Sequence, residues 1–132
     1  MSCACESMNV ILYCRQWGEA VAFYRDTLGF QPKLATDWLV EFEAGPNLCL
    51  SVADAKRTTI QPSGGAGITV TFKVANVRGV WQDLLGKDVK VEPLRDNRLG
   101  GLAFFLRDPE GHRLEFWSES GVNEEAGIPG HV

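Results

Sequence analysis

Residues 104–117, FFLRDPEGHRLEFW, contain the carboxylate whose position in this chain is most suggestive of chemistry. The pattern predicts a strand with Leu114 and Phe116 on one face and Glu115 on the other. A carboxylate in a half-buried strand needs a partner, because an unpaired buried charge is costly. Glu115 is therefore a candidate metal ligand, a hydrogen-bond anchor for a bound molecule, or a solvated strand residue.

The residues before this strand predict a tight turn. Asp108, Pro109 and Gly111 hold the first, second and fourth positions of a type I turn, in which Pro presets φ. The segments on either side should therefore pair as a β-hairpin, which fixes where Glu115 points.

The first half of the chain predicts a strand, a helix and three more strands. An apolar strand at residues 10–14 precedes a helix at residues 17–28, whose apolar residues recur at three and four positions until Gly29 ends it. The three further strands are expected at residues 30–35, 38–43 and 48–53.

The second half predicts the same order of elements. A strand at residues 68–74 precedes a helix at residues 77–85, which ends at Gly86. Strands are then expected at residues 89–94, 102–107 and 113–117.

The two halves also align as residues. Residues 20–30, AVAFYRDTLGF, match residues 77–87, VRGVWQDLLGK, at a constant offset of 57, and the hairpins align at an offset of 66. The shared order and the shared Asp, Leu and Gly positions indicate an internal duplication. We therefore expect one α+β domain with a first module at 8–54, a linker at 55–66, a second module at 67–118 and a tail at 119–132. Because one helix covers one sheet face, two βαβββ modules should form a curled mixed sheet around a cavity.

Composition narrows the classes of partner. The formal net charge is -4 and Lys and Arg do not cluster, which argues against nucleic acid. No apolar run approaches the roughly 18 to 20 residues that a membrane-spanning helix needs, so no membrane partner is expected. The N-terminus lacks the pattern of a leader sequence, which predicts a cytoplasmic protein with four reduced cysteines. The role of Cys3 and Cys5 is left open.

At this point the chain resembles the vicinal oxygen chelate superfamily, which includes glyoxalase I, bleomycin resistance proteins and extradiol dioxygenases. The resemblance covers about residues 8–118, and AFYRDTLGF at 22–30 and FLRDPEGHRLEF at 105–116 are its most specific parts. The pattern is most similar to small metal-free members of the bleomycin-resistance type. It implies the two-module fold, but the fold alone does not transfer a function.

In the metal-dependent members of this superfamily, ligands come from the first and last strands of each half. The corresponding positions here resemble Asn9, Cys49, Thr69 and Glu115, of which only Glu115 is a usual ligand. The resemblance therefore implies no metal and no other cofactor. The alternative is a divalent metal held by Glu115, Cys49 and Asn9.

The two histidines do not complete a metal site in this interpretation. His112 resembles a residue that is common beside this turn for structural reasons. His131 lies in the acidic, Gly-containing tail, for which disorder is expected.

The expected ligand is a small organic molecule, aromatic or cationic in character. Strand alternation places the predicted lining on one face of each module. The predicted binding residues are Asn9, Ile11, Tyr13, Trp38, Cys49, Thr69, Thr71, Arg113, Glu115 and Trp117. Within this lining Glu115 is a ligand anchor, a partner of Arg113 or Lys73, or a candidate general base.

Three functions follow from these residues and from the resemblance. The first is a metal-independent, homodimeric protein that binds or sequesters a small molecule. The second is a divalent-metal-dependent lyase, thiol transferase or dioxygenase with a divergent ligand set around Glu115. The third is an interaction module whose cavity is filled by its own side chains.

Overall fold

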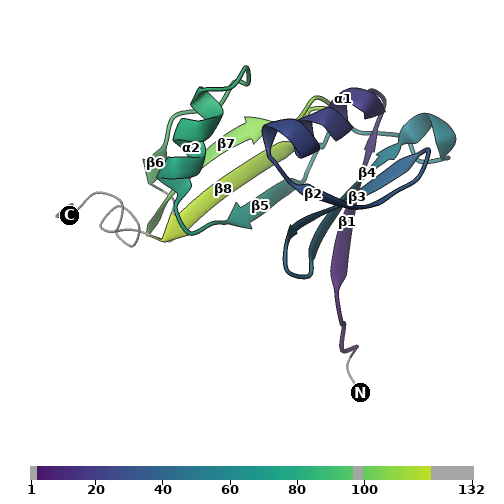
Figure 1. Ribbon diagram of the computed structural model, residues 1–132, viewed down its shortest axis with the longest axis horizontal. Coiled ribbons are helices and arrows are strands. Elements are labelled where there is room, and N and C mark those ends of the chain that lie inside the picture. The colour runs from purple at the N-terminus through teal and green to yellow at the C-terminus, as the bar shows by residue number, and fades with distance from the viewer. Residues whose placement is uncertain (1–2, 97–99, 120–132) are drawn as a thin grey trace. The chain divides into compact units, whose positions relative to one another are not determined.

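A computed structural model of the chain describes residues 3–96 and 100–119. The chain divides into two compact units, Met1–Ser63 and Gly64–Val132, and each unit contains one four-stranded mixed sheet. The order of elements confirms the predicted α+β class and its tandem βαβββ modules (Figure 1). The predicted disorder of the tail and the role of His131 lie outside the described residues.

The first unit contains four strands and the helical segments that join them. Its elements are β1 (Met8–Cys14), α1 (Trp17–Ala22), η1 (Phe23–Thr27), β2 (Gln31–Ala35), β3 (Leu39–Gly45), β4 (Leu48–Asp54) and η2 (Ala55–Arg57). The strands lie in the order β1-β4-β3-β2. The β1 and β4 strands are parallel, and the other neighbouring pairs are antiparallel.

The helix predicted at residues 17–28 changes its type along its length. Its first part, α1, is α-helical, whereas η1 is a π-helix, so the prediction of one regular period was wrong for the last turns. In η1 the adjacent Phe23 and Tyr24 are both buried and their rings meet edge to face, 5.2 Å apart. The wider turn thus lets two consecutive aromatic residues enter the core. The helix ends before Gly29, which has a φ of 76°.

The core of the first unit lies between this helix and one face of its sheet. The buried residues Leu12, Phe42, Leu50 and Val52 come from β1, β3 and β4. The ring of Tyr24 lies 6.1 Å from that of Phe42. Because strand side chains alternate between the two faces, residues such as Asn9 and Cys49 belong to the opposite, helix-free face.

The second unit repeats this arrangement. Its elements are β5 (Thr69–Lys73), α2 (Val77–Leu85), β6 (Arg95–Asp96), β7 (Gly101–Arg107) and β8 (Arg113–Glu119). The strands lie in the order β5-β8-β7-β6, again with a parallel pair, β5 and β8. The α2 helix has the predicted bounds, and the Asn76 side chain caps it by accepting a hydrogen bond from the Gly79 amide at 3.1 Å.

The strand predicted at residues 89–94 is the main error in the predicted elements. Only Val91 forms a bridge, with Leu106, and the short strand β6 begins later, at Arg95. Pro93 has no amide hydrogen to donate to a ladder. The Glu92 carbonyl also accepts a hydrogen bond from the Trp81 indole at 3.0 Å. Both features interrupt the apolar run that predicted a longer strand.

Aromatic stacking fills the core of the second unit. The Phe116 ring lies 5.0 Å from the Phe72 ring and 5.6 Å from the Phe104 ring. Val77 and Leu84 of α2 are buried with them. The helix-free face of this sheet therefore carries the alternate residues of β5, β7 and β8, including Glu115. In the described part of the chain, no helix has both the length and the apolar character needed to cross a membrane.

Candidate ligand-binding site

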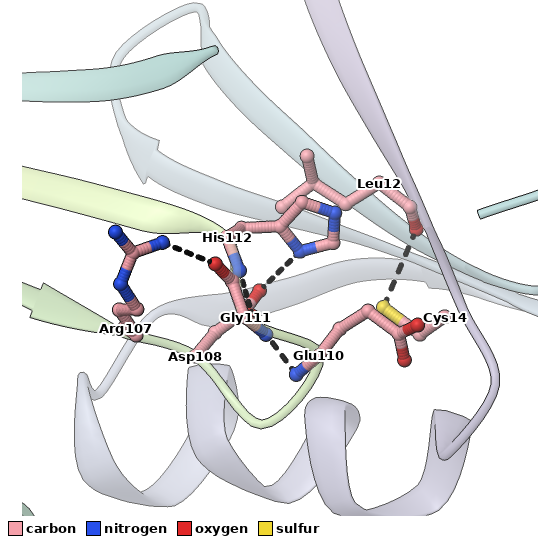
Figure 2. A network of polar contacts seen from close by, with 7 residues as sticks. All are labelled: Leu12, Cys14, Arg107, Asp108, Glu110, Gly111 and His112. Carbon is pink, nitrogen blue, oxygen red and sulfur yellow. Dashed lines mark hydrogen bonds and ion pairs between the residues drawn. The ribbon is translucent and has the colours of Figure 1, made fainter. Parts of the chain in front are cut away.

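The turn between β7 and β8 is held together by the carboxylate of Asp108 (Figure 2). One oxygen of this buried side chain accepts hydrogen bonds from the amides of Glu110, Gly111 and His112, at 2.8 to 3.0 Å. The other oxygen lies 2.8 Å from Nδ1 of His112. The Gly111 amide also donates to the Asp108 carbonyl at 3.0 Å, which confirms the predicted turn. The structure thus gives His112 a structural role.

The register of the hairpin positions Glu115 between two neighbours. Thr71 of β5 is its partner on one side and Phe105 of β7 its partner on the other. Thr69 instead lies opposite Arg113. Because Asn9 pairs with Cys49 in the first unit, the register makes Thr71 the counterpart of Asn9.

Glu115 is half-buried, and its carboxylate forms no hydrogen bond or ion pair with the residues that the structure describes. Both of its predicted partners are engaged elsewhere. The Lys73 ammonium lies 2.9 Å from the Glu119 carboxylate and 5.2 Å from the centre of the Trp117 ring. Arg113 donates to the Thr69 hydroxyl at 3.4 Å. Within the described residues, neither predicted partner therefore occupies the Glu115 carboxylate.

Phe105 lies between two guanidinium groups. The guanidinium carbon of Arg113 is 4.0 Å from the centre of the Phe105 ring, and that of Arg95 is 5.7 Å away. A guanidinium at these distances from a ring is attracted by its π-electrons. The surrounding pocket has a volume of about 400 Å³ and is lined by Thr69, Arg95, Asp96, Ala103, Phe105, Arg113 and Glu115.

A second pocket adjoins the first on the same unit. It has a volume of about 460 Å³, and its lining consists of Gly64, Gly65, Ala66, Gly67, Ile68, Thr69, Arg107 and Arg113. Thr69 and Arg113 line both pockets. The predicted residues Thr69, Arg113 and Glu115 are thus brought together in the second unit, and Thr71 and Trp117 share their sheet face.

The predicted residues of the first unit lie on β1 and β4 and just before β3. Asn9 and Ser51 exchange hydrogen bonds at 3.0 and 3.1 Å. Cys49 lies in register with Asn9, and a hydrogen bond to the Glu41 carboxylate raises the pKa of its thiol. Ile11 and Tyr13 alternate with the core residues of β1. Trp38 precedes β3, and its carbonyl accepts a hydrogen bond from the Asp54 amide at 2.7 Å.

These donors do not fit a divalent metal. The Asn9 side chain exchanges hydrogen bonds with Ser51, and Asn and Thr offer only neutral oxygens to a cation. The Thr69 hydroxyl accepts from a guanidinium, whose charge opposes a nearby cation. Among the residues that the structure describes, no three His, Cys, Asp or Glu side chains are grouped so that they could hold a metal.

Among the pocket residues that were not predicted from the sequence, Phe105, Arg107 and Arg95 carry the aromatic and positively charged groups. Phe105 was detectable, because strand alternation in the predicted hairpin places it on the face of Glu115, where the register makes it a neighbour. Arg107 was detectable by the same alternation. Arg95 was not, because the strand before it was predicted at residues 89–94, and β6 covers only Arg95–Asp96.

Comparison with known proteins identifies the fold. The model of the Glyoxalase/Bleomycin resistance protein/Dioxygenase superfamily matches residues 8–116. A comparison with curated protein sequences found no significant match.

Solved structures share this fold at low sequence identity. Lactoylglutathione lyase from Agrobacterium tumefaciens is 22% identical with a TM-score of 0.70, over 84% of this chain and 91% of that one. A glyoxalase/bleomycin resistance protein/dioxygenase from Nocardioides is 19% identical, with a TM-score of 0.74 over 100% and 92% of the two chains. The antibiotic binding protein TnmS3 from Streptomyces sp. CB03234 is 17% identical, with a TM-score of 0.75 over 91% and 100%. The TM-scores establish a common fold, and one fold can host several functions.

Proposed function

The chain belongs to the Glyoxalase/Bleomycin resistance protein/Dioxygenase superfamily, and from this premise we propose that it binds a small planar organic molecule without a metal. The observation that carries the proposal is the pocket around Phe105, with a guanidinium 4.0 Å from the ring centre and a half-buried carboxylate beside it. A planar ligand binds favourably to such a surface, since it can stack on the Arg113 guanidinium that covers the Phe105 ring, and polar groups fix its orientation.

The size and the polar groups of the pocket support a small ligand. Its volume of about 400 Å³ falls within the range of small-molecule sites. The carboxylate of Glu115 accepts N–H or O–H donors from the ligand. TnmS3, which shares the fold, is an antibiotic binding protein, and this supports binding as a function of the fold.

Titration of tryptophan fluorescence with planar aromatic probes tests the proposal. Trp117 lies on β8 two residues after Glu115, on the same sheet face, so a bound probe should quench it. We expect saturable quenching that Phe105→Ala weakens at least about tenfold, because the stacking surface is lost. Leu85→Ala, on the exposed side of α2, is the control and should bind as the parent does. Failure of every probe in the panel to saturate would refute the function.

Metal analysis separates this proposal from the metal-dependent alternative. Protein purified without chelators should contain less than stoichiometric metal, because the donors described above do not fit one. The parent and Glu115→Ala should then give the same metal content. Stoichiometric metal in the parent that is lost from Glu115→Ala would establish the alternative instead.

A further inference from the structure

Two arginines face each other across the β7–β8 hairpin. Arg107 ends β7 and Arg113 begins β8, and the register makes them direct partners. Neither forms an ion pair with any residue that the structure describes. Like charges directly opposite one another destabilise an antiparallel pair. An anion between them would remove this repulsion.

Both guanidinium groups are held in place by neutral partners. Nη1 of Arg107 donates to the Gly111 carbonyl at 2.8 Å, as Figure 2 shows. Arg113 is fixed by the Thr69 hydroxyl at 3.4 Å and by the Phe105 ring. Each guanidinium has five N–H donors, so both keep donors for a ligand. Because their positions are already fixed, binding costs less side-chain entropy.

A glycine turn forms the opposite wall of this pocket. Gly64, Gly65 and Gly67 have φ values of 71°, 82° and 82°. A Cβ atom on Gly65 would lie 2.7 Å from Cα of His112, so this turn packs closely against the Asp108 turn. The GGAG segment, predicted as part of a flexible linker, thus forms one side of a pocket of about 460 Å³.

We propose that this second pocket binds an acidic group, a carboxylate or a phosphate, of the planar molecule that occupies the pocket beside Phe105. The proposal deepens the proposed function and rests on it, since Arg113 lines both pockets. Arginine forks match the geometry of both acids and form strong, charge-assisted hydrogen bonds with them. Glu115 lines the first pocket and not the second, so its charge directs the acid toward the arginine pair. In this proposal the ligand is an aromatic acid, whereas the sequence predicted an aromatic or cationic molecule.

Three matched probes test the acid group on the full chain: 2-naphthoate, 2-naphthyl phosphate and the neutral 2-naphthamide. At least one acid should bind about tenfold or more tightly than the amide, since a charge-assisted hydrogen bond of this kind is worth about that factor. The tighter of the two acids identifies the acid class. Arg107→Gln should reduce that preference about tenfold and leave the affinity for the amide within about twofold. Arg57→Gln, an exposed arginine of the first unit, is the matched control and should change nothing.

Equal affinity for the three probes, unchanged by Arg107→Gln, would overturn the acid-group assignment and leave the proposed function standing. If no probe saturates, the proposed function fails. Inorganic phosphate then tests separately whether the arginine pair binds an anion. Phosphate should raise the Tm of the parent above that in chloride of equal ionic strength. It should not raise the Tm of the Arg107→Gln, Arg113→Gln double variant. The same Tm response in both proteins would show that the arginine pair binds no anion.

Discussion

At the scale of single residues, the carboxylate of Asp108 organises the hairpin that carries the candidate site. It satisfies three backbone amides and the His112 ring from a fully buried position. Arg107 and Arg113 flank this turn as direct partners on β7 and β8. The contacts of Asp108 therefore hold the backbone on which both candidate-site arginines lie.

Replacing the Asp108 carboxylate should lower the free energy of unfolding. Asp108→Ala removes the side-chain acceptor of the part-buried Glu110 amide and of the buried His112 amide, and leaves the Gly111 amide only the Asp108 carbonyl; each buried donor without an acceptor costs about 1–3 kcal/mol. We expect the free energy of unfolding to fall by about 3 kcal/mol or more, with a smaller loss for Asp108→Asn, which retains an acceptor oxygen. Urea unfolding measures both. Asp83→Asn, an exposed residue of α2 paired with Lys87, is the control and should change stability by less than about 0.5 kcal/mol.

The Cys49 thiol offers a second test at this scale. The hydrogen bond to Glu41 is the main cause of its raised pKa, with desolvation and the charge of Glu43 also contributing. A raised pKa means less thiolate at a given pH, so alkylation should be slow. In a variant with Cys3 and Cys5 changed to Ser, Glu41→Gln should speed the reaction of Cys49 with iodoacetamide several-fold at pH 8. Glu43→Gln should have the smaller effect, and mass spectrometry of the alkylated peptide follows both.

The sequence predicted where Glu115 lies but not what surrounds it. Alternation and the turn residues were sufficient for its strand and face, because these depend on local chemistry. One of its three predicted roles, a partner of Arg113 or Lys73, is not found in the structure, where these two side chains bind Thr69 and Glu119. Those cations contact Thr69, Phe105 and Glu119, which depends on rotamers and cross-strand packing that no local pattern encodes.

At the scale of elements, the predictions were correct where local residues mark the ends of a helix or strand. The α2 helix has the expected bounds because Asn76 caps its start and Gly86 follows its end. The π-helical turn and the interrupted strand near Pro93 were missed, because both arise from core packing and from a carbonyl bound to Trp81. The order of helices and strands is thus easier to predict than the places where a helix changes its type or a strand is interrupted.

In the glycine turn, alanine should destabilise the protein more at Gly65 than at Gly67. Gly65 and Gly67 share a φ of 82°, so an alanine at either is strained by about 1–2 kcal/mol. Only Gly65→Ala also places its Cβ 2.7 Å from Cα of His112. We therefore expect Gly65→Ala to reduce the free energy of unfolding by about 2 kcal/mol more than Gly67→Ala, as measured in urea. Equal losses would show that the two turns do not pack as described.

At the scale of the whole molecule, the duplicated units differ in the charges on their helix-free faces. In the first unit Glu41 and Glu43 lie beside Cys49, whereas in the second Arg107 and Arg113 lie beside Phe105. The net charge of -4 conceals this local excess of arginine, which is why composition alone did not indicate an acidic ligand. The fold and the duplication could be predicted from the periodicity of the sequence. The positive charge of the pocket could not, because it depends on the strand register that brings Arg107 and Arg113 together.

The helix-free faces of the two sheets support the predicted homodimer. In each sheet one face lacks its own helix, and β1 and β2, like β5 and β6, have one neighbour only within their sheet. Unpaired edges and uncovered apolar residues favour association with another surface. On the first sheet Ile11 and Leu34 belong to the helix-free face and are 40% and 52% exposed. We therefore expect light scattering to give twice the 14.5 kDa mass of one chain.

A charge on this face should separate the subunits if the prediction is correct. Ile11→Asp should shift the measured mass toward that of a single chain, because a buried unpaired carboxylate is strongly disfavoured. Leu85→Asp introduces the same charge at an exposed position of α2, so it should leave the dimer intact. A single-chain mass for the parent at every concentration would refute the dimer. A dimer that both variants leave intact would place its interface away from Ile11.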